Sequence, residues 1–150
     1  MTSRMAPHTD RQRPSKLGLF CNDFPLIVQS VLNTYGSLLD ISLISAGTHA
    51  NYGLNVWADE WRFIRGGEIL LRSEVSPREL IRQLHRRLRG CRLTEIIISR
   101  DNRRIRLLFE KDAMIYISAE KFNEDAMDVF RDDAFLFGVS NGTIVQGDYA

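Results

Sequence analysis

Three short strand-like runs joined by two-residue turns lie in the second half of the sequence, and no other feature limits the fold as much. The runs are residues 93–99, 104–110 and 114–118, and the turns are Asp101-Asn102 and Lys111-Asp112. The first run is apolar and β-branched, and the second alternates apolar and polar side chains, as strands do. Because turns this short join antiparallel neighbours, the sequence predicts a three-stranded antiparallel meander.

Further strands are indicated on both sides of the meander. The candidates are residues 38–44, 54–58, 61–65, 68–72, 135–139 and 143–146. Gly66-Gly67 predicts a tight hairpin turn between two of these runs, because glycine tolerates positive φ. Asn141-Gly142 predicts a second hairpin near the end of the chain.

A helix is predicted to begin at Ser76-Pro77-Arg78-Glu79. Its serine and glutamate have the spacing of a capping box, and proline suits the first helical position. The apolar stripe of this helix consists of Leu80, Ile81, Leu84 and Leu88. We expect this stripe to be buried against a sheet that contains Ile105, Leu107 and Phe109, because these residues share one face of a strand.

An earlier helix is predicted over residues 24–35, with Pro25 at its first position and Gly36 at its end. These elements together indicate the α+β class, as a single domain with an antiparallel sheet of six to eight strands and two main helices packed on one side. Residues 1–16 are polar and contain two prolines, so we expect a flexible N-terminal arm before a domain spanning residues 17–150.

Several functional classes lack the residues they need. The three histidines, His8, His49 and His85, have no ligand partners at metal-binding spacing, and no nucleotide loop or nucleophile motif occurs. We therefore expect no enzymatic activity, no metal and no cofactor. Cys21 and Cys91 show no motif, and we favour two unbridged thiols. No apolar run suits a membrane span or a secretory signal, which favours a cytoplasmic location.

The charges are unevenly distributed although the net charge is only +1. Residues 62–106 contain thirteen arginines and five acidic residues, a difference of +8. Residues 120–150 contain seven acidic residues against Lys121 and Arg131, a difference of −5. Two oppositely charged regions therefore cancel in the total, and they either pair within the fold or form separate faces for a partner.

The acidic C-terminal region is the candidate partner-binding surface. The residues expected to form it are Glu124, Asp125, Asp128, Phe130, Asp132 and Asp133. Aromatic anchors supply affinity at protein interfaces, and surrounding charge speeds and orients docking. The competing interpretation is that these carboxylates pair with the arginines of residues 82–106.

Part of the chain from Trp61 onward resembles small immunity proteins that are encoded beside bacterial polymorphic and contact-dependent growth-inhibition toxins. The resemblance is carried by the hairpin WRFIRGGEILLRS, the helix SPRELIRQLHRRLRG and the meander LTEIIISRDNRRIRLLFEKDAMIYIS with its acidic, aromatic tail. It implies a cytosolic protein that binds one cognate toxin domain and occludes its active site. No site residue carries over by motif, because the contact surfaces of such proteins vary.

A second hypothesis is a small regulatory domain that self-associates through a sheet edge or binds nucleic acid through the arginine-rich helix. We favour it less, because charged residues opposite an apolar stripe are typical of any amphipathic surface helix. No membrane partner is expected, and the sequence leaves the oligomeric state open.

Overall fold

The computed structural model describes residues 2–4, 16–33, 39–73 and 77–147. Within these residues the chain forms two helices and one antiparallel sheet of twelve strands, which confirms the α+β class but exceeds the six to eight strands predicted. The helices are α1 (Lys16–Asn22) and α2 (Pro77–Leu88). The strands are β1 (Thr2–Arg4), β2 (Leu26–Asn33), β3 (Leu39–Ser45), β4 (Asn51–Val56), β5 (Glu60–Arg65), β6 (Glu68–Arg72), β7 (Arg92–Ser99), β8 (Arg104–Phe109), β9 (Ala113–Ser118), β10 (Asp125–Arg131), β11 (Ala134–Ser140) and β12 (Thr143–Gln146).

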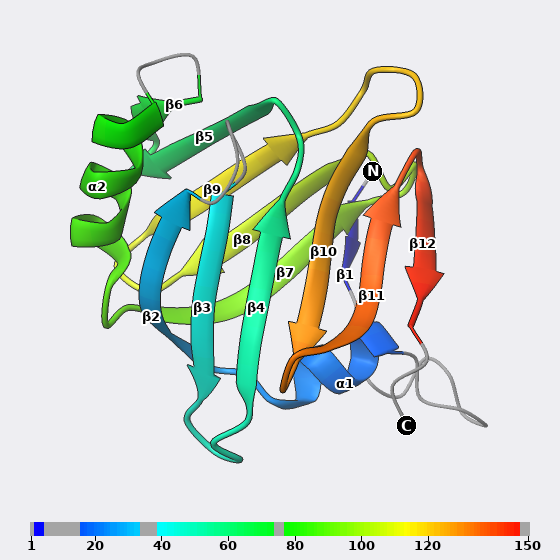
Figure 1. Cartoon of the computed structure of the whole chain (residues 1–150). Helices are drawn as coiled ribbons and strands as arrows, with labels where there is room; N and C mark the ends of the chain where they lie inside the picture. Colours follow the sequence, from blue (N-terminus) through cyan, green and yellow to red (C-terminus); the bar gives the residue numbers. More distant parts are fainter. Residues whose placement is uncertain (1, 5–15, 34–38, 74–76, 148–150) are drawn as a thin grey trace.

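The sheet folds over on itself into two layers (Figure 1). The front layer consists of β12, β11, β10, β4, β3 and β2, in that order, and the rear layer of β7, β8, β9, β5 and β6. The layers are joined where β2 meets β7, through only the pairs Leu26–Leu93 and Ile27–Arg92. Strand β1 pairs with the other end of β7. The rear strands run obliquely behind the front ones, and the apolar core lies between the two layers.

Alternation along the strands decides which side chains enter the core. In β8, Ile105, Leu107 and Phe109 are buried, whereas Arg104 and Arg106 are exposed, as predicted. The meander of β7, β8 and β9 and both predicted hairpins are present. Each layer therefore has an inner face in the core and an outer face toward solvent.

Helix α2 is confirmed, and its predicted stripe of Leu80, Ile81, Leu84 and Leu88 is buried. It packs mainly against β2 and touches β6, two strands of the same sheet as the strand that holds Ile105. Because β2 pairs with β7 only at Leu26 and Ile27, the rest of its edge is left for the helix to cover. The N–H of Val31 donates to Nδ1 of His85 at 3.0 Å, so this histidine is a structural acceptor and not a surface residue. The predicted cap, Ser76, lies outside the described residues.

The helix predicted over residues 24–35 is wrong, because residues 26–33 form β2 and the first helix is α1. A register shift between Val28 and Ser30 interrupts the alternation of β2, so Leu26, Val28 and Val31 are the buried positions. The buried residues of β2 are therefore two and then three positions apart, a spacing that resembles the apolar periodicity of a helix. The helices also do not share one side, since α1 contacts β11 whereas α2 contacts β2 and β6.

The two described parts of residues 1–16, which were predicted to form a flexible arm, both belong to secondary structure. Residues 2–4 form β1, and Lys16 begins α1; residues 5–15 lie outside the described part of the chain. Neither of the two described helices has the length and apolar character needed to span a membrane.

Candidate functional site

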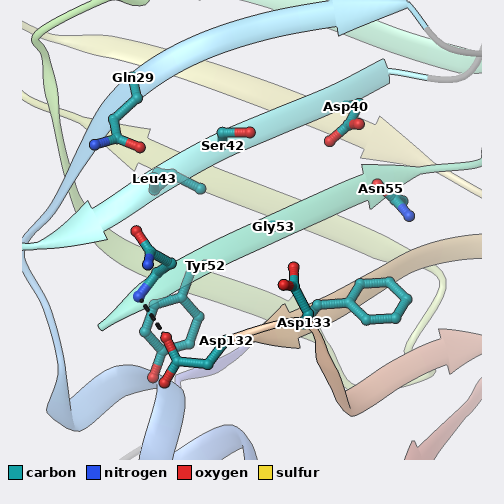
Figure 2. A pocket seen from close by; sticks show the side chains of 11 residues that line it. Gln29, Asp40, Ser42, Leu43, Tyr52, Gly53, Asn55, Asp132 and Asp133 are labelled. Atoms are coloured by element: carbon teal, nitrogen blue, oxygen red, sulfur yellow. Dashed lines mark hydrogen bonds between the residues drawn. The ribbon is translucent and has the colours of Figure 1, made fainter. Parts of the chain in front are cut away.

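The outer face of the front layer carries a hollow of about 610 Å³ that spans β2, β3, β4 and β10 (Figure 2). The residues that line it are Gln29, Asp40, Ser42, Leu43, Asn51, Tyr52, Gly53, Asn55, Phe130, Asp132 and Asp133. Most of them are polar residues from the positions that alternate with the core positions of each strand. The hollow is therefore a feature of the solvent face of the sheet and not a gap in the core.

Gly53 provides the floor of the hollow. It lies in register with Ser42 on one side and Phe130 on the other, so a residue without a side chain separates a hydroxyl from an aromatic ring. A Cβ at this position would lie 3.9 Å from the Cβ of Phe130, an ordinary contact distance. The ring of Phe130 also packs edge-on against Phe135, with centroids 5.7 Å apart, which fixes the wall of the hollow.

The turn between β10 and β11 brings two carboxylates to the edge of the hollow. Asp132 and Asp133 have φ values of 48° and 68°, the left-handed backbone of a two-residue hairpin turn. The Asp132 carboxylate accepts the N–H of Asn51 at 3.0 Å, and its own N–H donates to the Asn51 carbonyl at 2.8 Å. These bonds tie the turn to the start of β4. Asp133 is exposed and lines the hollow.

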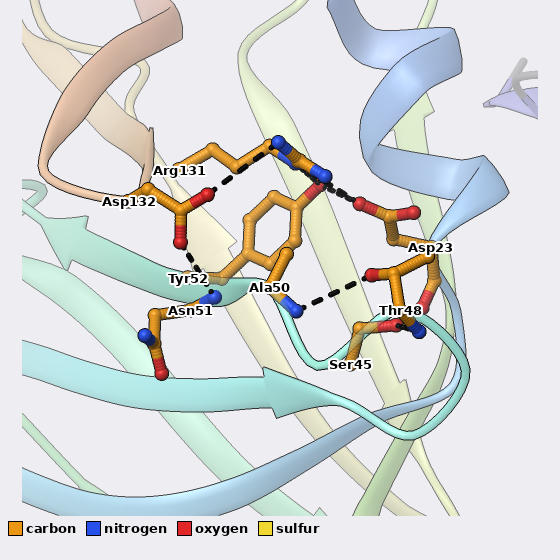
Figure 3. Close-up of polar contacts among 8 residues, drawn as sticks. All are labelled: Asp23, Ser45, Thr48, Ala50, Asn51, Tyr52, Arg131 and Asp132. Carbon is orange, nitrogen blue, oxygen red and sulfur yellow. Dashed lines mark hydrogen bonds and ion pairs between the residues drawn. The ribbon is translucent and has the colours of Figure 1, made fainter.

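Arg131 lies next to this turn, but its charge is directed elsewhere (Figure 3). Its Nε is 3.1 Å from the Asp23 carboxylate and 3.1 Å from the Tyr52 hydroxyl. Tyr52 in turn donates to Asp23, and burial, followed by the neighbouring Asp23, raises the pKa of Tyr52 above its usual range. Nη1 of Arg131 also lies 3.5 Å from the Asp132 carboxylate. The cation therefore joins β10 to the segment after α1 and neutralises Asp23.

Asp128 lies one row along the same face, in register with Asn55. It is half-buried, and its carboxylate accepts the indole N–H of Trp57 at 2.9 Å. Burial raises the pKa of Asp128, the nearby Asp125 raises it further, and the indole bond opposes both effects. The carboxylate occupies space left by Gly138, where a Cβ would lie 2.5 Å from its Oδ1.

All six predicted partner-binding residues lie on β10 or directly beside it, a strand that the sequence analysis did not predict. Phe130, Asp132 and Asp133 line the hollow, and Asp128 lies on the same face. Glu124 and Asp125 are at the opposite end of the strand. There the Glu124 carboxylate accepts the N–H groups of Asp59 and Lys121, and the Ser140 hydroxyl donates to Asp125.

The acidic end near Glu124 is compensated by positive charge. A second hollow of about 470 Å³ lies there, and its carboxylates form three exposed ion pairs. The pairs are Glu60–Arg62, Glu120–Arg104 and Asp59–Lys121. Pairing with the arginine-rich region thus holds for Glu120, whereas Asp132 is paired with its neighbour Arg131. Among the described residues, one ion pair of the acidic region, Glu120–Arg104, involves an arginine of residues 82–106, and Glu120 lies before β10.

Sequence reasoning missed the part of the hollow contributed by β2, β3 and β4. The alternation of apolar and polar residues in LDISLIS and NYGLNV could have indicated that Asp40, Ser42 and Asn55 face away from the core. The sequence does not reveal that β4 pairs with β10, because the two strands are far apart in the chain. Only this pairing brings Asp40 and Asp133 into one site.

The remaining candidate residues do not form a site. Cys21 and Cys91 are both free, and burial, followed by the charge of Glu95, raises the pKa of the Cys21 thiol to about 11. Among the described residues, no three His, Cys, Asp or Glu side chains are grouped to hold a metal ion. Comparison with protein-family models, curated proteins and solved structures gives no match. The class of protein must therefore be inferred from the hollow itself.

Proposed function

We propose that the protein is a cytosolic immunity protein that binds a cognate bacterial toxin domain, a nuclease, and neutralises it by occluding its active site. The observation that carries the proposal is the charge of the hollow on the front layer. Its lining includes Asp40, Asp132 and Asp133 and, among the described residues, no lysine, arginine or histidine. A nuclease holds the phosphates of its substrate in a basic cleft, and such a cleft is complementary in charge to this surface.

The shape of the hollow supports a protein ligand. Gly53 leaves room for a protruding side chain of a partner, and Phe130 offers an aromatic surface beside it. An arginine or lysine that entered here would meet carboxylates at the rim and an aromatic ring on one wall, a combination that favours cations. Electrostatic steering would also speed association, which an inhibitor of a lethal enzyme requires.

The alternative function, nucleic-acid binding through α2, has less support. The outward arginines of this helix are exposed, and Arg82 lies 3.6 Å from Glu79. The apolar face of α2 is buried against β2. The arginines on its outer face are therefore those expected of any amphipathic surface helix.

The proposal requires a toxin domain encoded beside this protein, and two single substitutions test it against that domain. Asp133→Lys reverses a charge at the rim, and we expect it to slow association about tenfold or more and to weaken the salt dependence of the rate. Gly53→Val fills the floor with a residue that suits a strand, and we expect it to accelerate dissociation while leaving the salt dependence unchanged. Asp132 is a poorer choice, because its carboxylate bonds Asn51.

Glu68→Lys is the matched control, since it makes the same charge change on an exposed position of β6. Stopped-flow mixing and a growth-protection assay measure the effects, and circular dichroism checks the fold. If Asp133→Lys and Gly53→Val bind and protect like the parent protein, the hollow is not the toxin-binding site.

A further inference from the structure

The outer face of the rear layer, on the opposite side of the molecule from the hollow, carries a row of apolar side chains. Leu108, Met114, Ile64 and Ile69 are in register across β8, β9, β5 and β6. The first three are partly exposed, and Ile69 is 37% exposed. Antiparallel sheets that face water normally carry polar residues at such positions. The apolar row extends across four strands and ends at β7, where Glu95 is in register with Leu108. Exposed apolar patches are typical of interaction surfaces.

A second row, one step along the same strands, carries positive charge. Arg106, Tyr116, Arg62 and Arg72 are in register on this face. The guanidinium of Arg62 lies over the Tyr116 ring, 6.0 Å from its centroid, and pairs with Glu60. Arginine, tyrosine and methionine are the residue types enriched at protein interfaces. These two rows together resemble an interface core with a charged border.

Negative charge lies on the other side of the apolar row. Glu110 directly follows β8 and continues the pairing with β7, because its N–H donates to the Arg92 carbonyl at 3.0 Å and its carboxylate Oε1 accepts the Arg92 N–H at 3.2 Å. Asp112 lies in the turn that follows and is exposed. Along β8, Arg106 and Glu110 thus flank Leu108 symmetrically, two residues on each side. Along β8 the face is therefore striped from Arg106 through Leu108 to Glu110, and its negative side consists of Glu110 and Asp112 with Lys111 between them.

A striped surface of this kind is complementary to itself. A two-fold axis along the apolar row places a second copy face to face with the first and exchanges the positive and negative bands. Leu108 and Met114 then meet their own counterparts, and Arg106 faces Glu110 of the second copy. Isologous dimers require this self-complementarity, and stacked sheets pack about 10 Å apart with their side chains in contact. An axis along the strands would instead bring arginine against arginine.

We propose that the protein forms a two-fold symmetric dimer through the outer face of the rear layer, with the apolar row at the centre and Arg106–Glu110 ion pairs at both borders. The front layer of each copy faces outward in this arrangement, so the dimer presents two acidic hollows to partners. This proposal is independent of the toxin, because it concerns a different surface.

Charge reversal at the two border positions provides the test. Arg106→Glu alone places glutamate against glutamate across the axis, and Glu110→Arg alone places arginine against arginine. We expect each single variant to raise the dimer dissociation constant about tenfold or more in sedimentation equilibrium. An equimolar mixture of the two variants pairs opposite charges at both borders, so we expect it to recover the mass of the dimer. The double variant Arg106→Glu/Glu110→Arg should also recover it.

Two further variants keep the result interpretable. Arg86→Glu reverses a charge on the exposed face of α2 and should leave the dimer unchanged. Met114→Lys places a charge in the middle of the apolar row and should yield monomers, with circular dichroism confirming that the fold is retained. The proposal is overturned if the parent protein stays monomeric throughout the concentration series, or if it dimerises and mixing the two single variants restores nothing.

Discussion

At the scale of single residues, Asp128 shows how burial and a hydrogen bond compete at one carboxylate. Burial raises its pKa, and the indole N–H of Trp57 stabilises the charged form. A carboxyl group with a raised pKa binds its proton more tightly in the folded than in the unfolded chain. The charged carboxylate therefore destabilises the folded state. This destabilisation is fully present above the pKa of the folded state and disappears below the pKa of the unfolded chain, about 3.9.

Asp128→Asn should therefore raise the melting temperature near neutral pH, since the amide oxygen can still accept from Trp57 without carrying a charge. The gain should shrink as the pH falls and vanish below about pH 3, where the wild-type carboxyl is protonated in both states. Thermal unfolding of both proteins across this range measures it. A variant that is less stable at neutral pH would show that the charged hydrogen bond outweighs the cost of burial.

At the scale of elements, α2 is the helix that covers the edge of β2, and Leu84 is its fully buried centre. Leu84→Ala should lower the free energy of unfolding by ~2–5 kcal/mol, through lost burial and the cavity left behind. Denaturant titration measures this change. Arg86→Ala, exposed on the same helix, should change it by no more than ~0.5 kcal/mol. Equal values for the two variants would contradict the packing of α2 described here.

Local signals decided which elements could be predicted from the sequence. The helix with its proline start, the glycine and asparagine hairpins and the meander are each encoded by neighbouring residues, and each was predicted. Two of the errors, the helix predicted at β2 and the missing β10, fall on strands with a register shift. The shift in β2 imitates a helix, and the shift between Asp125 and Met127 leaves Ala126 and Met127 both buried, which hides β10. The acidic wall of the hollow was predicted, but its other walls depend on long-range strand pairing.

At the scale of the whole molecule, the near-zero net charge hides two different faces. The front layer presents a hollow with carboxylates at its rim, and the rear layer presents bands of opposite charge around an apolar row. Pairing between the acidic and arginine-rich regions is confined to exposed contacts such as Glu120–Arg104, which contribute little to stability. The proposed toxin-binding surface and the proposed dimer face both rest on this uneven charge distribution.

Carboxyl footprinting tests the central claim most directly, because it reports on the aspartates of the hollow without substituting any residue. The protein is treated with a carbodiimide and an amine, alone and with the toxin domain that the proposal requires, and modification at each residue is measured by mass spectrometry. We predict that the toxin protects Asp40 and Asp133, whereas Glu79 on α2 and Asp112 on the rear layer are modified to the same extent in both samples. Unchanged modification of Asp133 in a saturated complex would contradict the account.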